Sequence, residues 1–274
     1  MSPLPNAATK EVSEATTSVR ICVLGSGSGG NCTLVATAKT RLLIDAGFSF
    51  REIRLRLQEI GEDFARLDAL LITHEHSDHV SGLAALARSF HKPIYLTPLT
   101  AQQIDWKDSN PVVENFQAGE RLAIGDLEVD SFTVPHDAVD PVAFCFRAQG
   151  LKVGVVTDLG YMPDSVKHYL RGCHLLVLES NHDLEMLKVG PYPWFVKQRV
   201  MSRVGHLSNH AVGEYLAADY DRSAQILVLA HLSEQNNHPE IAWMSATDAL
   251  RQAGAGDTRL VLAEQRRPTE VFEL

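Results

Sequence analysis

The run THEHSDH at residues 73–79 constrains the fold of this chain more than any other feature. It follows ALLIT (69–73), whose continuous apolar character predicts a buried strand, and it leads into SDHVSGLAALARSF (77–90), which predicts a helix. With 12 histidines in 274 residues, a chance HxHxDH pattern is expected on the order of 10⁻³ times per chain. The fold must therefore place a buried strand end, a helix start and this cluster together.

The side chains in this run favour metal binding. Residues two apart at a strand end project to the same side, so His74 and His76 can face one ion, while Asp78 and His79 in the first helical turn can face a second. The alternative is a polar loop in which Ser77 or Asp78 caps the helix and the histidines are merely exposed.

Three further candidate ligands each sit at the end of a predicted strand. His136 follows LEVDSFTV, Asp158 ends LKVGVVTD and His231 ends AQILVLAH. Because their recurrence at strand ends accompanies an established histidine cluster, we expect them to join the same site.

Strands and helices mix along the rest of the chain, which indicates an α/β fold. Residues 20–24, 32–36 and 41–46 predict a β-meander, and PVAFCFRA and HLLVLES predict two more strands. Helices are expected at 49–60, 209–219 and 239–252. No Pro/Gly/Ser-rich linker interrupts the chain, so we expect one domain over residues 19–274 after a polar tail at 1–18 that lacks the features of a secretory signal.

Composition bounds the compartment and the partners. No apolar run approaches the roughly 18–20 residues that span a bilayer, so no membrane partner is expected. The four cysteines are scattered without a CxxC pair, which predicts reduced thiols in a cytoplasmic protein. The formal net charge of −9 disfavours the whole surface as a nucleic-acid binder, so an anionic substrate must be held locally.

Five segments of the chain, taken in order, resemble the motifs of metallo-β-lactamase-fold hydrolases over roughly residues 19–274: Asp45 in LLIDAG, HEHSDH, His136, Asp158 and His231. The resemblance implies a four-layer αββα sandwich of two mixed β-sheets flanked by helices. It also implies two divalent ions, Zn²⁺ or Mn²⁺. The first would bind His74, His76, His136 and a bridging Asp158, and the second would bind Asp78, His79, Asp158 and His231. Asp45 would orient ligand histidines.

More narrowly, the phrases GSGSGGNC, LITHEHSDHVSGL, ESNHDLEML, GHLSN and AHLSEQNN resemble the YycJ/VicX (WalJ) type, a bacterial subgroup associated with nuclease activity. We therefore expect a phosphodiesterase or exonuclease that acts on DNA through a hydroxide bridging two metals, with Asp78 in the catalytic centre. The departing alkoxide needs a proton, and either His182 or His206 could donate it. The alternative for each of these two histidines is a capping or solvent-facing role.

Residues 186–213 contain four basic residues and no acidic residue, with Tyr192, Trp194 and Phe195 among them. We expect Lys197, Arg199 and Arg203 to bind substrate phosphates while the aromatic rings stack on bases. The alternative is that these rings pack a loop onto the core.

The glycine-rich loop GSGSGGN lacks a GK[ST] ending and precedes a strand, so no nucleotide cofactor is expected, and Asn31 is assigned a polar contact to substrate. Two other functions stay open. One is a small-molecule hydrolase of cyclic phosphodiesters or thioesters, and the other is a non-catalytic metal-binding regulatory protein. The sequence leaves the oligomeric state undecided.

Overall fold

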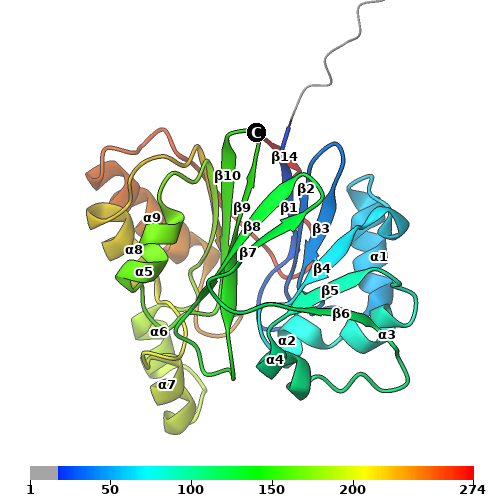
Figure 1. Ribbon diagram of the computed structural model, residues 1–274. Helices are drawn as coiled ribbons and strands as arrows, with labels where there is room; N and C mark the ends of the chain where they lie inside the picture. Colours follow the sequence, from blue (N-terminus) through cyan, green and yellow to red (C-terminus); the bar gives the residue numbers. More distant parts are fainter. Residues whose placement is uncertain (1–17) are drawn as a thin grey trace, which may run out of the picture.

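The computed structural model describes residues 18–274 and arranges them as two β-sheets packed face to face, with helices on both outer faces (Figure 1). One apolar cluster fills the space between the sheets, and two more fill the space between each sheet and its helices. These four layers confirm the predicted αββα sandwich. Residues 1–17 of the expected polar tail lie outside the described range.

The first sheet has seven strands. In spatial order they are β14 (Phe272–Glu273), β1 (Arg20–Gly25), β2 (Cys32–Ala36), β3 (Arg41–Ile44), β4 (Ala69–Leu71), β5 (Pro93–Leu96) and β6 (Val112–Asn115). The expected meander β1–β2–β3 is antiparallel, and β3 through β6 are parallel. Because β3 and β4 are parallel, their carboxyl ends deliver Asp45 and the 73–79 run to the same edge.

The second sheet also has seven strands. In spatial order they are β13 (Arg259–Leu262), β12 (Ile226–Ala230), β11 (Leu175–Glu179), β10 (Leu151–Val156), β9 (Val142–Ala148), β8 (Leu127–Thr133) and β7 (Arg121–Ile124). Strands β10 to β13 are parallel, and β8 runs in their direction because antiparallel β9 separates it from β10. The carboxyl ends of β8, β10, β11 and β12 therefore share one edge.

The helices cover the outer faces and the edge where these strands end (Figure 1). They are α1 (Phe50–Glu59), the 3₁₀ turn η1 (Phe64–Arg66), α2 (Ser77–Val80), α3 (Leu83–Ala87), α4 (Pro98–Gln103), α5 (Asp164–Leu170), α6 (Leu184–Val189), α7 (Trp194–Val200), α8 (Asn209–Ala218) and α9 (Pro239–Gln252). Among residues 18–274, no helix combines the length and apolar character needed to cross a lipid bilayer.

The single helix predicted at 77–90 is wrong, because the structure has two short helices there, α2 and α3. The interruption lies at Gly82, whose N–H donates to the Ala46 carbonyl oxygen at 2.9 Å. A Cβ atom at this position would lie 1.8 Å from the Phe48 carbonyl oxygen. The loop after β3 thus approaches the helix backbone so closely that only glycine fits.

Candidate metal centre

All seven residues predicted as metal ligands meet where the two sheets present their strand ends. They form two groups, His74 with His76 and His136, and Asp78 with His79, Asp158 and His231. Within each group the candidate ligand atoms lie within 4.8 Å of one another. Nitrogen and carboxylate oxygen donors in such groups are the ones that hold divalent ions such as Zn²⁺ and Mn²⁺.

In the first group, three imidazole rings face one another with centroids 4.7–5.0 Å apart. His136 Nδ1–H donates to the Gly205 carbonyl oxygen at 3.0 Å, which leaves its Nε2 as an acceptor that lies 3.1 Å from His76 Nδ1. The Nε2 atom of His74 is buried without a hydrogen-bond partner. Burial lowers the pKa of His74 and of His136, so both rings stay neutral, the form that binds metals.

In the second group, His79 Nε2 lies 3.1 Å from Asp158 Oδ2 and 3.5 Å from Asp78 Oδ2. His231 Nε2 lies 3.3 Å from Asp78 Oδ2. The other oxygen of Asp158, Oδ1, lies 3.9 Å from Nε2 of His136 in the first group. Asp158 therefore lies between the two groups, with Oδ1 also 3.5 Å from His231 Nδ1 of the second group.

Two further carboxylates fix the orientation of the second group. Asp45 Oδ2 accepts from His79 Nδ1 at 2.7 Å, and Glu179 Oε1 accepts from His231 Nδ1 at 2.8 Å. Since Nδ1–H is committed in each ring, Nε2 keeps its lone pair for the centre. Asp45 is itself held by the N–H and hydroxyl of Thr73. Asp45 thus has the contact that an orienting residue requires.

Glu179 was not singled out in the sequence. A signal for it existed, because Glu179 ends the strand HLLVLES, and β11 lies between β10 and β12, whose ends carry Asp158 and His231. Its Oε1 also accepts from His206 Nδ1 at 2.8 Å, and its Oε2 accepts from the N–H groups of Leu159 and Leu207. Glu179 is fully buried, and it links two histidines of the site.

Four carboxylate groups lie in or against this buried cluster, and positive charge stabilises them. Burial opposes ionisation of Asp158, but His231 and His79 outweigh it and lower the pKa of Asp158 well below its ordinary value. For Glu179, His206 likewise outweighs burial and lowers the pKa to about 2. Burial would lower the pKa of His231, yet Asp158 and Asp78 raise it to about 10. The site therefore attracts positive charge, whether protons or metal ions.

Three site residues adopt left-handed backbone conformations directly after strands. The φ angles are 61° at Asp45, 60° at Asp158 and 56° at His231. Such conformations cost about 1–3 kcal/mol each for residues other than glycine and concentrate at functional sites. The turn aims each side chain at the centre instead of letting it continue the alternation of its strand.

A cleft of about 310 Å³ opens over the second group, and its walls include His206. The residues that line it are Ser28, His76, Ser77, Asp78, Asp158, Arg199, His206 and His231. Asp78 and His206, both predicted to be catalytic, thus line the cleft. His182 does not. Its side chain is buried outside the cleft lining, and burial lowers its pKa to about 4, so the expected proton donor at this position is neutral and enclosed.

Two of the four residues predicted to bind substrate are placed differently. Lys197 is buried, and its ammonium donates to the Lys188 carbonyl oxygen at 2.7 Å, so it joins α7 to the end of α6 instead of facing a phosphate. Asn31 is buried and donates to Asp78 Oδ2 at 3.2 Å, while its oxygen accepts from Ser26 and Gly27. The polar atoms of Asn31 therefore hold the ligand loop, and the expected substrate contact is not available.

The two arginines remain accessible. Arg199 lines the cleft and forms an ion pair with Asp137, the residue after His136. The Arg203 guanidinium lies 4.1 Å from the ring centroid of Tyr161. Gly160 packs tightly on the Arg203 backbone, since a Cβ atom there would lie 2.4 Å from the Arg203 carbonyl carbon. This contact holds Arg203 beside the loop that carries Asp158.

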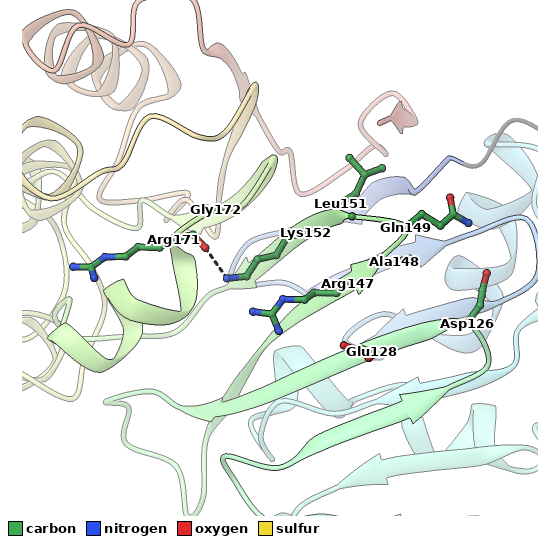
Figure 2. Close-up of a pocket in the computed structure, with 10 residues that line it drawn as sticks. Asp126, Glu128, Arg147, Ala148, Gln149, Leu151, Lys152, Arg171 and Gly172 are labelled. Atoms are coloured by element: carbon green, nitrogen blue, oxygen red, sulfur yellow. Dashed lines mark hydrogen bonds between the residues drawn. The ribbon is translucent and has the colours of Figure 1, made fainter.

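A larger cavity, of about 610 Å³, lies at the other end of β10 (Figure 2). Lys152 is in its wall and donates to the Arg171 carbonyl oxygen at 2.7 Å. Lys152 and Asp158 are six residues apart along an extended strand, so about 20 Å separates this cavity from the metal centre. Its lining has no histidine and no cysteine. The chemistry is therefore concentrated at the smaller cleft.

The sandwich and the histidine and aspartate cluster together define a hydrolase of the metallo-β-lactamase class. A sequence profile described as "Beta-lactamase superfamily domain" matches residues 40–232. The chain belongs to this superfamily and, within it, to the YycJ/WalJ family. It is 38% identical over 237 residues to exodeoxyribonuclease YycJ of Bacillus anthracis, an alignment covering 85% of this chain and 90% of that protein.

A second relative agrees with this assignment, and a solved structure agrees with the fold. Exodeoxyribonuclease WalJ of Streptococcus pneumoniae is 37% identical over 239 residues, covering 85% of this chain and 89% of that protein. The crystal structure of the metallo-β-lactamase fold protein YhfI from Bacillus subtilis superimposes with a TM-score of 0.70 and 18% identity, covering 94% of this chain and 100% of that chain. The similarity to YhfI bears on the fold alone.

Proposed function

We propose that this protein is an exodeoxyribonuclease that hydrolyses DNA with two divalent metal ions, Zn²⁺ or Mn²⁺. The observation that carries the proposal is the position of Asp158 between two groups of histidine and aspartate ligands. The names of its YycJ and WalJ relatives, both exodeoxyribonucleases, support DNA as the substrate.

The residues present suit two metal ions. His74 Nε2 is a buried donor atom without a partner, as expected of a nitrogen that serves a metal. His74, His76 and His136 would hold one ion, Asp78, His79 and His231 the other, and Asp158 would serve both. When bound, such ions lower the pKa of a water molecule and neutralise charge on the attacked phosphate.

His206 is the proposed proton donor to the departing alkoxide. Glu179 accepts its Nδ1–H, so Nε2 is the nitrogen left to carry a proton at the cleft. The same hydrogen bond fixes the orientation of the His206 ring. Arg199 and Arg203 would hold phosphate oxygens of the strand, since guanidinium groups match that geometry.

We further propose that the protein works in the cytoplasm. All four cysteines are free and buried, which suits a reducing compartment.

The test incubates purified protein and Mn²⁺ or Zn²⁺ with end-labelled linear DNA. Progressive shortening by the wild type, lost in His76→Ala, is the expected result. His206→Ala should slow turnover by about 10²–10⁴-fold and retain its metal content. Hydrolysis of only cyclic phosphodiesters or thioesters would show that the protein is a small-molecule hydrolase. Full metal occupancy without any turnover would show that it is a non-catalytic metal-binding protein.

A further inference from the structure

The outward face of α7 carries two large aromatic side chains in water. Trp194 is 63% exposed and Phe195 is 72% exposed, so neither ring packs a loop onto the core. Five of the exposed large apolar side chains among residues 18–274 lie in this region: Val189, Trp194, Phe195, Met201 and Val204. A gathering of exposed apolar groups beside a functional cleft marks an interaction surface.

The spacing along α7 connects these rings to the cleft. Phe195 and Arg199 are four residues apart, so they share one face of the helix, about 6 Å apart along its axis. Arg199 lines the metal cleft. In Figure 1, α7 lies at the same end of the sandwich as α2, which carries Asp78 and His79. A strand that leaves the cleft past Arg199 meets Phe195 next.

The helix is held firmly enough to act as a platform. Lys197, on its inner face, is buried and donates to the Lys188 carbonyl oxygen at 2.7 Å. Arg199 is anchored by its ion pair with Asp137. Pro193 immediately precedes the helix and restricts the backbone there. The aromatic rings are therefore presented on a fixed backbone, which reduces the entropy lost on binding.

Arg203 supplies the positive charge on this face that favours an anionic partner, because Arg199 is paired with Asp137 and Lys197 is buried. No acidic residue occurs from 186 to 213, although the chain as a whole has a formal net charge of −9. Among residues 18–274 the Arg203 guanidinium has no carboxylate within ion-pair distance, and it lies over Tyr161. Exposed aromatic rings interleaved with arginines match a polyanion that has flat, unpaired bases.

We infer that Trp194 and Phe195 form a stacking platform for the bases of single-stranded DNA as it leaves the metal cleft. The inference rests on the proposed nuclease function and adds that the strand beside the cleft is unpaired, because a base within a duplex cannot stack on a side chain. The platform binds through ring faces, so it accepts any base sequence.

The test measures binding apart from hydrolysis. The metal-loaded protein is titrated into a fluorescent phosphorothioate oligothymidine, and the dissociation constant is obtained from anisotropy. The double variant Trp194→Ala/Phe195→Ala should bind at least about tenfold more weakly than the wild type, since each stacked base contributes roughly fivefold to 150-fold. Trp243→Ala, which removes an exposed indole on α9, is the matched control and should bind like the wild type.

An oligonucleotide of the same length without bases separates stacking from charge. The wild type should bind it at least about tenfold more weakly than oligothymidine, and the double variant should show no further loss. An unchanged dissociation constant in the double variant, or an equal loss on the abasic strand, overturns the platform. If the wild type degrades no DNA yet shows this base-dependent binding, the platform stands and the proposed nuclease function fails.

Discussion

At the scale of single residues, the geometry of the metal centre depends on the hydrogen bonds that orient each imidazole ring. His79 is fully buried, with Nδ1 bonded to Asp45 at 2.7 Å and Nε2 3.1 Å from Asp158. Asp45 does not line the metal cleft and lies behind the ligands, so it acts through His79. Carboxylates in this position raise the basicity of a ligand imidazole and fix its tautomer.

Asp45→Asn keeps the size of the side chain and tolerates the left-handed backbone at this position. It removes the charge that supports His79, so we expect metal affinity to fall about 10–100-fold. The measurement is metal release to a competing chelator. Asp248→Asn makes the same chemical change on the exposed face of α9 and should release metal like the wild type. Equal release from all three proteins would remove Asp45 from the centre.

The raised pKa of His231 predicts how the stability of the metal-free protein changes with pH. Its pKa is raised from an ordinary 6.5 to about 10, since Asp158 and Asp78 outweigh burial. Protonation of the folded state therefore contributes stability that is fully present below pH 6.5 and is lost as the pH rises toward 10. Calorimetry of the metal-free protein should show Tm falling by several degrees, on the order of 3 °C or more, across this window. Metal-loaded protein should change less, because the proton has been replaced. A metal-free Tm that rises over the same window would contradict this assignment.

The metal ligands could be predicted from the sequence because they lie at strand ends. The roles of other site residues could not, because those residues are buried by tertiary contacts. His136, Asp158 and His231 could be assigned because each ends a recognisable apolar run. Lys197 and Asn31 looked like surface groups, yet tertiary contacts with Lys188 and Asp78 bury both. No local pattern encodes such contacts.

At the scale of secondary-structure elements, short segments escaped prediction. Strand β6 has one half-buried residue among four, and β7 is similarly exposed, so neither shows the alternation that identifies a strand. Helices α4, α6 and α7 have only six or seven residues each, too few to establish a helical period. The longer buried strands β8 to β12 lie where the sequence predicted them.

At the break between α2 and α3, we predict that a substitution changes stability in the opposite direction to the one that helix propensity predicts. Alanine is about 1 kcal/mol better than glycine inside a helix, so propensity alone favours Gly82→Ala. The close approach of the Phe48 carbonyl oxygen makes the added Cβ clash. We expect Gly82→Ala to lower the unfolding free energy by at least about 1–3 kcal/mol.

Gly213→Ala in α8 is the matched comparison. The nearest atom to its new Cβ would be Ser245 Oγ at 3.4 Å, an ordinary contact. This variant should be as stable as the wild type or up to about 1 kcal/mol more stable. Denaturant unfolding measures both variants. A stabilised Gly82→Ala would show that the loop after β3 does not restrain the helix start.

At the scale of the whole molecule, a protein with a formal net charge of −9 must bind an anionic strand against its own overall field. The interaction then depends on a few local cations. Replacing Arg203 by alanine should reduce the slope of log affinity against log salt concentration by about one, because one fewer counterion is released. Arg251→Ala on α9 removes an exposed arginine away from the cleft and should leave the slope unchanged. A slope that is equal in the two variants would place the strand elsewhere on the surface.

Each sheet supplies part of the site, since His79 follows β4 of the first sheet and Asp158 follows β10 of the second. The most direct test of a shared centre is to add Mn²⁺ or Zn²⁺ stepwise to metal-free protein while measuring degradation of labelled linear DNA. We predict that degradation rises until about two equivalents are bound and is then constant. Full activity at one equivalent, or none at any ratio, would contradict a two-ion nuclease centre.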